Sequence, residues 1–552
     1  MNFNKRTILE LLTLCFVISL FFINKREKTD RPVPIEFVNK KKDRKKFKQG
    51  RKDWMKNMHR SNPETDWELM DRSFRKDRAN RINKLRKELF LQGWSDIEGY
   101  TEVIGDREIS GVWNEKGSNN LAGRIHTAEI DFDNELIYCG SSGGNIWKGS
   151  LNGENWISLN DHMQIRDIKM IRIKDFLDYR RLLICGGKSF YYTDNEGITI
   201  EESAGLDALD DWGNTIRSII KDDIIYLLTN EWDYQNWNAA CAIYKSTDNG
   251  MSFERIMMFD NNNGYDIWTS RYEETPVYVI NNNQIYILDN QDDLSLIGNI
   301  MTFESGDNLL TGGYDGGVFL YAKVGDRIYY SNNGGLSWSD KGNQPQWTFM
   351  SNSFNSSNID PNLVGIGGME LFISDNSANT WSVVNSWWEY YDDPVNLLHA
   401  DIPEIRFFID NDGNEMSLIS TDGGLYASYD NLESTQNLSL NGLGVSQYYS
   451  TYTKRSEPYH IYAGSQDQGF QRTNGDNGGI LEFEQSISGD YGHLSSGDGG
   501  QTIWCNYPGF TMYYDTPQTD GGGATLNFPG SNYLWLAPLI EHPNSPNMAW
   551  LG

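Results

Sequence analysis

The residues best suited to chemistry gather in one short segment, Asn385 to Asp401 (NSWWEYYDDPVNLLHAD). Exposed aromatic rings stack on sugars or anchor protein contacts, and carboxylates beside a histidine can bind a cation or transfer protons. The candidate binding residues of this segment are Trp387, Trp388, Glu389, Tyr390, His399 and Asp401. The alternative is structural: His399 and Asp401 bond each other and the backbone, and the indoles fill a core.

Further candidates lie elsewhere in the chain. The segment Glu231–Trp237 (EWDYQNW) has the same character and contributes Trp232 and Trp237 as candidate binding residues. Glycoside hydrolysis needs two carboxylates that face each other across a cleft. The candidates for that role are Asp392, Asp393, Asp401, Asp467 and Asp498.

No metal or cofactor site is predicted. Asp410 to Asn414 resembles the start of a calcium-binding loop, but the twelfth position is Thr421 and not the glutamate that such loops use. We expect a hairpin turn there.

A recurring eight-residue pattern indicates the elements that carry these loops. The pattern is Ser-x-Asp-x-Gly-x-Ser/Thr-Trp. An Asp or Asn side chain accepts hydrogen bonds inside a turn, and Gly supplies the positive φ of a tight hairpin. The clearest copies begin at Ser246, Ser331 and Ser374, and degenerate copies begin at Gly149, Thr193 and Ser428. The residues expected to hold these turns are Ser246, Asp248, Gly250, Ser331, Asn333, Gly335, Trp338, Ser374, Asn376 and Trp381.

The spacing of these turns predicts the architecture. Successive copies start 44, 53, 85, 43 and 54 residues apart, and the long step contains a further strand pair at Val277–Leu288. Gly-Gly pairs return at a similar place in the units, at residues 143, 186, 312, 367 and 423. Units of about 40–50 residues with four short strands are typical of propeller blades. We therefore predict an all-β, multi-bladed β-propeller.

Blade number is left open at this point. The count reaches nine units with a tenth begun near Leu539, which fits one ring of about ten blades or a seven-bladed ring followed by part of a second. The last stretch, residues 539–552, resembles only the opening of a blade. We expect residues 537–552 to form an unpaired strand or to close a ring with residues 101–115, and we expect the sequence to be part of a longer protein.

The N-terminal hundred residues differ from the rest. A basic pair, Lys5 and Arg6, precedes the apolar run Ile8–Ile23, which predicts a signal peptide or signal anchor within residues 1–30. Residues 31–100 are predicted to be a basic linker and an amphipathic helix near Pro63–Phe90. The basic stretch is either a solvated stalk or a contact for anionic lipid or polysaccharide.

Charge divides the chain at the same place. Residues 1–100 carry 25 Lys and Arg against 14 Asp and Glu, whereas residues 101–552 carry 23 against 62. So acidic a body repels nucleic acid, which leaves protein or neutral glycan as the expected partner. Membrane contact is expected only through the N-terminal segment. Of five cysteines, none has metal-ligand spacing, and we expect Cys139, Cys185, Cys241 and Cys505 to be buried core residues.

Several of these motifs resemble known families. The eight-residue pattern resembles the Asp-box, or bacterial neuraminidase repeat, which in that family is structural and lies opposite the ligand site. Trp113–Trp147, Ser420–Tyr426, Asn441–Leu443, Gly464–Gly469 and Gly497–Gly500 resemble, in order, motifs of secreted bacterial sortilin-like (Vps10-like) propeller proteins, often labelled glycosyl-hydrolase-like. This resemblance covers residues 101–552 and implies an extracytoplasmic, secreted or cell-surface location.

Two enzyme families share the repeats. Sialidases need three arginines around a carboxylate, and only Gly123-Arg124-Ile125-His126 is similar to their first arginine strand. Xyloglucanase-like enzymes place a base Asp two residues before a Gly-Gly pair, where this chain has Ser141. We predict a binding or interaction protein for protein or neutral glycan; the alternative is a xyloglucanase-like glycoside hydrolase.

Overall fold

The computed structural model describes residues 41–58, 65–93, 114–209, 213–261, 263–302, 304–457, 459–473, 478–515, 523–528 and 534–552. The predicted signal segment and residues 101–113 lie outside these ranges. The chain divides into two compact units. We call Arg51–Gln447 with Asp476–Phe483 the ring unit, and Met1–Gly50, Tyr448–Gly475 and Glu484–Gly552 the C-terminal unit.

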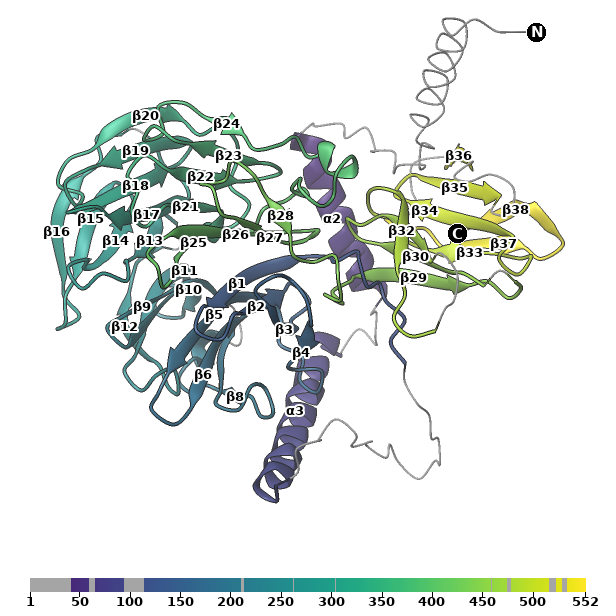
Figure 1. Ribbon diagram of the computed structural model, residues 1–552, viewed down its shortest axis with the longest axis horizontal. Coiled ribbons are helices and arrows are strands. Elements are labelled where there is room, and N and C mark those ends of the chain that lie inside the picture. Colours follow the sequence, from purple (N-terminus) through teal and green to yellow (C-terminus); the bar gives the residue numbers. More distant parts are fainter. Residues whose placement is uncertain are drawn as a thin grey trace, which may run out of the picture. The chain divides into compact units, whose positions relative to one another are not determined.

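The ring unit contains seven four-stranded antiparallel sheets among its described residues, each built from four strands that follow one another in sequence (Figure 1). The first three blades are β1 (Ile125–Asp131), β2 (Leu136–Ser141), β3 (Ile146–Ser150), β4 (Ile157–Ser158); β5 (Ile168–Asp175), β6 (Arg180–Gly186), β7 (Ser189–Thr193), β8 (Glu201–Glu202); and β9 (Gly213–Lys221), β10 (Ile224–Asp233), β11 (Asn238–Ser246), β12 (Glu254–Met258).

The next four blades complete the ring. They are β13 (Tyr265–Trp268), β14 (Val277–Asn281), β15 (Gln284–Leu288), β16 (Leu294–Asn299); β17 (Asn308–Tyr314), β18 (Val318–Val324), β19 (Arg327–Ser331), β20 (Ser339–Asn343); β21 (Phe354–Ser356), β22 (Val364–Gly367), β23 (Leu371–Ser374), β24 (Ser382–Val383); and β25 (Glu404–Ile409), β26 (Glu415–Thr421), β27 (Gly424–Ser428), β28 (Gln436–Asn437). The strand pair predicted at Val277–Leu288, which lacks the eight-residue pattern, corresponds to β14 and β15.

Contacts between strands of neighbouring blades define a closed ring. β1 packs against β5, β9 against β6 and β13, β17 against β13 and β21, and β21 against β25. β1 also contacts β25, β26 and β27 of the seventh blade, so the circle closes after seven blades. Of the two predicted arrangements, a seven-bladed ring followed by part of a second set of blades is the one observed. The inner strands are buried on both sides because neighbouring blades cover both faces of each sheet.

The eight-residue pattern forms hairpin turns between the third and fourth strands of its blades. In the best copy, Ser246 Oγ accepts from the Gly250 amide at 2.9 Å, and Asp248 Oδ1 accepts from the Ser252 amide at 2.9 Å. The copy at Ser331 repeats these bonds, with Asn333 Oδ1 accepting from the Ser337 amide at 3.0 Å. The predicted turn geometry is confirmed. The copies at Ser374, Ser428 and Thr193 make the same pair of bonds.

These turns also join neighbouring blades. The amide of Ala204, which follows the second blade, donates to Met251 O in the box turn of the third blade, and Phe253 N donates back to Ala204 O. A Cβ on Gly197 would stand 2.3 Å from Leu159 O of the preceding blade, so only glycine fits there. The eight-residue turns therefore stabilise their own hairpins and also the contacts between neighbouring blades.

One glycine-based expectation needs correction. Gly312 and Gly313 lie within the inner strand β17, because a side chain there would collide with Phe319 and Asn358, and not in a turn between second and third strands. Asp410, by contrast, lies in the predicted hairpin turn, where its Oδ1 accepts from the amides of Asp412 and Asn414 at 2.9 and 2.8 Å.

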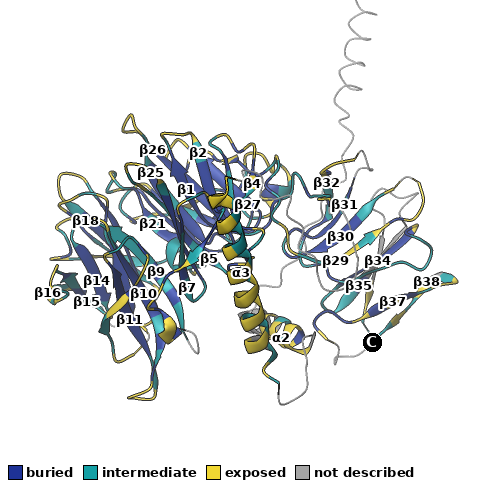
Figure 2. Ribbon diagram, turned by 90° about the horizontal axis from the view of Figure 1, so that it is seen from below, coloured by how far each residue is buried: buried dark blue, intermediate teal, exposed yellow. Residues whose placement is uncertain are grey.

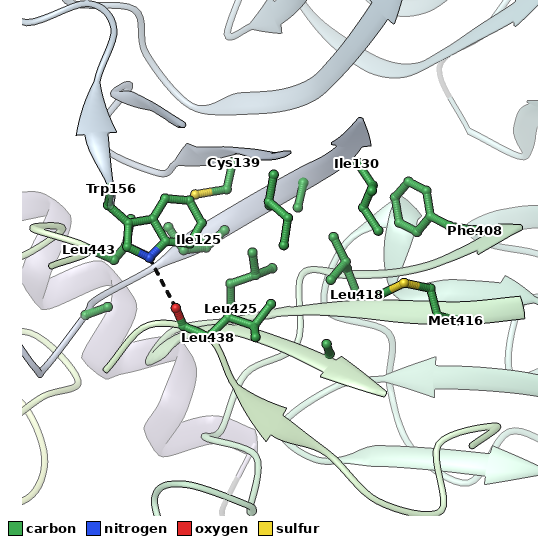
Figure 3. Close-up of a cluster of buried hydrophobic side chains, with 14 residues drawn as sticks. Ile125, Ile130, Cys139, Trp156, Phe408, Met416, Leu418, Leu425, Leu438 and Leu443 are labelled. Atoms are coloured by element: carbon green, nitrogen blue, oxygen red, sulfur yellow. Dashed lines mark hydrogen bonds between the residues drawn. The ribbon is translucent and has the colours of Figure 1, made fainter. Parts of the chain in front are cut away.

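A hydrophobic cluster closes the ring between the first and seventh blades (Figure 3). Trp156 donates its indole N–H to Leu438 O at 3.2 Å and also to Gly153 O at 3.0 Å. Around this bond lie Ile125, Ile130 and Cys139 from the first blade and Phe408, Met416, Leu418 and Leu425 from the seventh. Cys185, Cys241 and Cys505 are buried as well, as predicted for all four.

The C-terminal unit holds ten further strands in three sheets among its described residues. They are β29 (Tyr448–Thr453), β30 (Ile461–Ser465), β31 (Phe470–Thr473), β32 (Phe483–Ile487), β33 (Leu494–Ser495), β34 (Thr502–Tyr507), β35 (Phe510–Asp515), β36 (Gly523–Asn527), β37 (Leu539–His542) and β38 (Ser545–Leu551). β29–β32 and β33–β36 each form a four-stranded sheet, and β37 pairs with β38. The expectation of a single unpaired strand at residues 537–552 is wrong, because two strands of that region pair as a hairpin.

Two helices precede the ring. α3 (Trp67–Leu91) confirms a helix in this region, although its apolar side chains Met70 and Phe74 are exposed. Asp66 caps its first turn by accepting from the Leu69 amide at 3.0 Å. It lies against the second blade, where Arg86 donates to Ile198 O at 2.7 Å, and its outer side is exposed (Figure 2). The basic stretch expected to be a linker contains the helix α2 (Lys41–Met58). Neither helix is apolar enough over a sufficient length to span a membrane, and the described residues contain no other helix of that length.

Candidate functional site

Strand alternation sorts the loops of the ring unit onto two faces. Because neighbouring strands in a blade are antiparallel, turns between second and third strands share one face with the connections between blades. The remaining turns, including every box, lie on the opposite face. We call the first the loop face. Both aromatic segments belong to it, since Val384–Pro403 connects β24 to β25 and Tyr234–Trp237 connects β10 to β11.

A pocket of about 370 Å³ opens on the loop face beside the first blade. The start of β1 contributes Arg124, the β2–β3 turn contributes Ser142 and Asn145, and β3 contributes Trp147. Asp161 from the β4–β5 connection and Glu115 also line it. Residues 444–447, which follow the seventh blade, also line the pocket. The pocket thus lies at the seam where the ring closes.

The charge of Arg124 is compensated at this seam. Its guanidinium forms an ion pair with Asp422, which is almost fully buried in the β26–β27 turn. The exposed charges of the pocket are therefore the carboxylates of Glu115 and Asp161. Asp161 accepts from the Ser158 hydroxyl at 2.5 Å, and its other neighbour is the Asn145 amide at 3.5 Å.

The walls of the pocket are shaped by two small residues. A Cβ on Gly444 would stand 2.7 Å from Glu115 Oε1 and 3.1 Å from the edge of the Trp147 ring, so Gly444 lets both side chains approach closely. Ser141, at the position of the base in xyloglucanase-like enzymes, is buried, and its Oγ accepts from the Asn145 amide at 2.9 Å. Ser141 therefore holds the turn and supplies no carboxylate.

The aromatic connection between the sixth and seventh blades presents indoles at the surface. Trp388 is 51% exposed and Trp387 is half-buried, and their rings meet edge to face with centroids 5.8 Å apart. The Trp387 amide donates to Glu370 Oε1 at 3.2 Å. Trp347, from the preceding connection, is 38% exposed, and its carbonyl lies close to Gly368 in the same β22–β23 turn as Glu370. These three indoles can offer ring faces to a sugar or an apolar side chain.

The inner half of the same connection is buried. His399 lies over Gly423, where an added Cβ would stand 2.3 Å from the imidazole, and packs edge to face on buried Tyr390 at 4.8 Å. Its Nδ1 lies 3.0 Å from Ala400 O. The exposure expected of the two indoles is observed, but His399 is 4% exposed, so it packs as a structural residue. Asp401 is half-buried with φ of 61°, and its backbone carbonyl accepts from the Asp422 amide at 3.1 Å.

The candidate carboxylates are divided between the two units, with Asp392, Asp393 and Asp401 in the ring unit. Glu389 and Asp392 are exposed at the 3-10 helix η3 (Glu389–Tyr391), and Asp393 accepts from the side chain of Asn396 at 2.8 Å. Asp467 and Asp498 belong to the C-terminal unit. Asp498 accepts from the Thr502 amide at 2.9 Å, in a turn with the bonding of the box. No group of three or more His, Cys, Asp or Glu residues in the described ranges is placed to hold a metal ion.

The second aromatic segment is the tip of a long hairpin. Trp237 is 76% exposed with a φ of 54°, and Trp232 is half-buried on β10. Asp233 holds the tip by accepting from the amides of Gln235 and Asn236 at 2.8 and 3.2 Å. Glu231 is buried and accepts from the Tyr244 hydroxyl at 2.6 Å, so its role there is structural.

The axis of the ring is crossed by the short helix η2 (Ser351–Ser353) of the β20–β21 connection. Ser351 O accepts from Arg217 of β9 at 2.8 Å, and Asn352 donates to Glu404 of β25 at 3.2 Å and to Lys169 O of β5 at 3.3 Å. These bonds link blades on opposite sides of the axis.

The most useful residues missed from the sequence are Trp147, Glu115, Asp161 and Trp347. Trp147 and the Gly-Gly pair before it fit the strand-and-turn pattern of a blade, so they were interpreted as structural residues. Asp161 and Trp347 lie in connections between blades. Loops of this kind carry binding residues in many folds, so their place in the sequence could have identified them as candidates.

No family model matches the chain, and no curated protein sequence matches it. Among solved structures, the GH74 enzyme of Niastella koreensis is 12% identical, with a TM-score of 0.51 over 80% of this chain and 71% of that one. The fold is that of β-propeller proteins. YCF48 of Cyanidioschyzon merolae (11% identity, TM-score 0.35, 59% of this chain and 98% of that one) and the Pan2 WD40 domain of Neurospora crassa (12%, 0.34, 57% and 88%) are also similar. YCF48 is also known bound to a D1 peptide, and that structure is 13% identical with a TM-score of 0.37 over 58% of this chain and 99% of that one.

Proposed function

We propose that this protein is an extracytoplasmic binding protein whose loop face takes up a protein or neutral glycan ligand. One observation carries the proposal: the pocket beside Trp147 and the exposed indoles Trp347 and Trp388 belong to the loop face, opposite the structural box turns. Function concentrates on loops that a rigid scaffold positions.

The chemistry of the pocket favours a ligand without negative charge. The carboxylate of Asp422 neutralises the charge of Arg124. The carboxylates of Glu115 and Asp161 can accept hydrogen bonds from ligand hydroxyls or pair with a cation. Carboxylate and amide groups beside an aromatic ring suit the hydroxyls and apolar faces of a sugar. The acidic composition of residues 101–552 also disfavours an anionic ligand.

The location is proposed from the sequence. The apolar run Ile8–Ile23 after Lys5 and Arg6 supports export, either as a cleaved signal or as an anchor. The resemblance to sortilin-like and Asp-box proteins supports a secreted or cell-surface protein in the same way.

The alternative is a glycoside hydrolase. Its support is the fold shared with the Niastella koreensis GH74 enzyme and the presence of two carboxylates, Glu115 and Asp161, in one pocket. Against it, Ser141 stands where a xyloglucanase-like enzyme has its base, and its hydroxyl is used to hold the turn.

Binding to a glycan array and to immobilised peptides, together with a hydrolysis screen on neutral β-glucans, separates the two. We expect binding that falls in the variants E115Q/D161N and W388A but not in W237A, the matched exposed indole of the third blade. Product release from a β-glucan that E115Q/D161N abolishes would establish the hydrolase. Binding that only W237A removes would place the site on the β10–β11 hairpin.

A further inference from the structure

A second, larger pocket lies between the two helices and the ring, and the β4–β5 connection lines both it and the loop-face pocket. Its volume is about 660 Å³. α2 contributes one wall, the first turns of α3 another, and the β4–β5 connection the third. Its positive residues are Arg51, Lys52, Lys56, Arg75 and Arg166.

Positive charge dominates this pocket. Asp71 is the single acid among the described residues that line it, and it lies 2.9 Å from Arg75 and 3.6 Å from Arg166. One carboxylate thus faces two guanidinium groups. Arg51, Lys52 and Lys56 of α2 increase the excess of positive charge in the pocket. In a chain with a formal net charge of −28, this is a local reversal of sign. It attracts anions that the rest of the surface repels.

Apolar side chains adjoin the positive ones. Met55 and Trp67 line the pocket itself. Met70 and Phe74 follow Trp67 by three and seven residues, so they lie along the same side of α3. They are 47% and 66% exposed. Cations beside exposed apolar side chains on a helix are typical of surfaces that enter the headgroup region of a bilayer.

We propose that the helix pocket binds the phosphate headgroups of anionic phospholipids at a membrane surface, with Met70 and Phe74 entering the boundary of the acyl region. The phosphates would lie among the basic side chains of α2, Arg75 and Arg166. A soluble acidic polysaccharide would satisfy the charges but gains nothing from two exposed apolar side chains. The two pockets share no lining residue. Repulsion between the acidic residues 101–552 and an anionic bilayer favours contact through the helix pocket.

Flotation of the full chain with phosphatidylcholine vesicles, with and without phosphatidylglycerol, tests this. The N-terminal apolar run is present in every sample and contributes equally. The test variant is R51E/K52E/K56E, and the matched control is R78E/R81E/K84E, which makes the same change of charge at exposed positions of α3 outside the pocket. We expect the test variant to lose about tenfold or more of its affinity for the anionic vesicles, and the control to lose much less. Higher salt should reduce the binding of the unchanged protein.

A second variant separates lipid from other polyanions. M70S/F74S keeps every charge and should weaken binding to anionic vesicles while leaving any binding to polygalacturonate unchanged. The proposal is overturned if both charge variants lose affinity equally, or if the unchanged protein binds both kinds of vesicle equally. It is also overturned if the basic residues of α2 are needed for polygalacturonate but not for vesicles. Circular dichroism of each variant confirms that it is folded.

Discussion

Arg124 and Asp422, which are 298 residues apart in the chain, form an ion pair that ties the start of the first blade to the β26–β27 turn of the seventh. The same turn carries Gly423 beneath His399, and its Asp422 amide donates to the carbonyls of Ala400 and Asp401. The pair therefore connects ring closure, the wall of the loop-face pocket and the aromatic connection.

Removing one partner should cost far more than removing both. D422A leaves a guanidinium beside a buried, empty site, and we expect the free energy of unfolding of the ring to fall by about 3 kcal/mol. The double variant R124M/D422L should recover most of that loss, since neither charge is left alone. Chemical denaturation followed by tryptophan fluorescence measures both. Equal losses in the single and double variants would mean that an unpaired Arg124 carries no penalty of its own.

The box turn of the third blade should respond to acid. Burial by itself raises the pKa of Asp248, but hydrogen bonds from Ser252 and Ser246 outweigh it and hold the pKa below its usual value. The stabilisation is therefore present above the ordinary Asp pKa and is lost as the pH falls through the lowered one. We expect D248A to cost on the order of 1 kcal/mol at neutral pH, and less in acid. T247A, at the exposed neighbouring position, is the control.

Glu541 in β37 should make the C-terminal unit respond to pH in the opposite direction. Burial, with a contribution from Asp498, raises its pKa to about 7, although the Gly497 amide donates to its carboxylate. The folded state then binds more protons than the unfolded state between about 4.5 and 7, so stability falls as the pH rises through that window. E541Q should remove this slope and stabilise the unit at pH 8. Hydrogen exchange of β33 to β38 across pH measures it, and an unchanged slope in E541Q would contradict the assignment.

The four described cysteines should be chemically silent in the native protein. Burial raises the pKa of the thiols of Cys139, Cys185 and Cys505, and raises that of Cys241 to about 12. Thiolate is the reactive form. In a C15S background, alkylation by iodoacetamide should be undetectable until denaturant unfolds the chain. Rapid labelling of any one cysteine in buffer would show that its blade opens locally.

The sequence was sufficient for features that depend on local chemistry. Each box turn has a hydroxyl followed two residues later by a carboxylate or amide, and Gly250 follows in the best copy, so the residue types alone predict that Ser246 and Asp248 lie in a hairpin. The repeat length then predicts the blades. Ring size was left open because it depends on which blade meets the first, and a contact such as that between Arg124 and Asp422 has no local signature.

Prediction was poorer where tertiary packing decides the outcome. His399 looked like a site residue by type, but Gly423 provides a flat surface on which its ring packs, and no local pattern shows this. The charge density of Lys41–Met58 suggested a solvated stalk, yet the segment is helical. Trp147 was explained by its strand, although its ring also faces a pocket formed with residues that follow the seventh blade.

Each described blade of the ring is continuous in sequence. The residues that pack between the first and seventh blades are therefore synthesised at widely separated times. Trp156 and its acceptor Leu438 are separated by 282 residues. At ribosomal rates of about 5–20 residues per second, the apolar flank of the first blade waits roughly 15–60 s for its partner. During that interval Ile125, Ile130 and Trp156 have no seventh blade to cover them. The apolar face of the first blade therefore stays without its partner until synthesis passes residue 443.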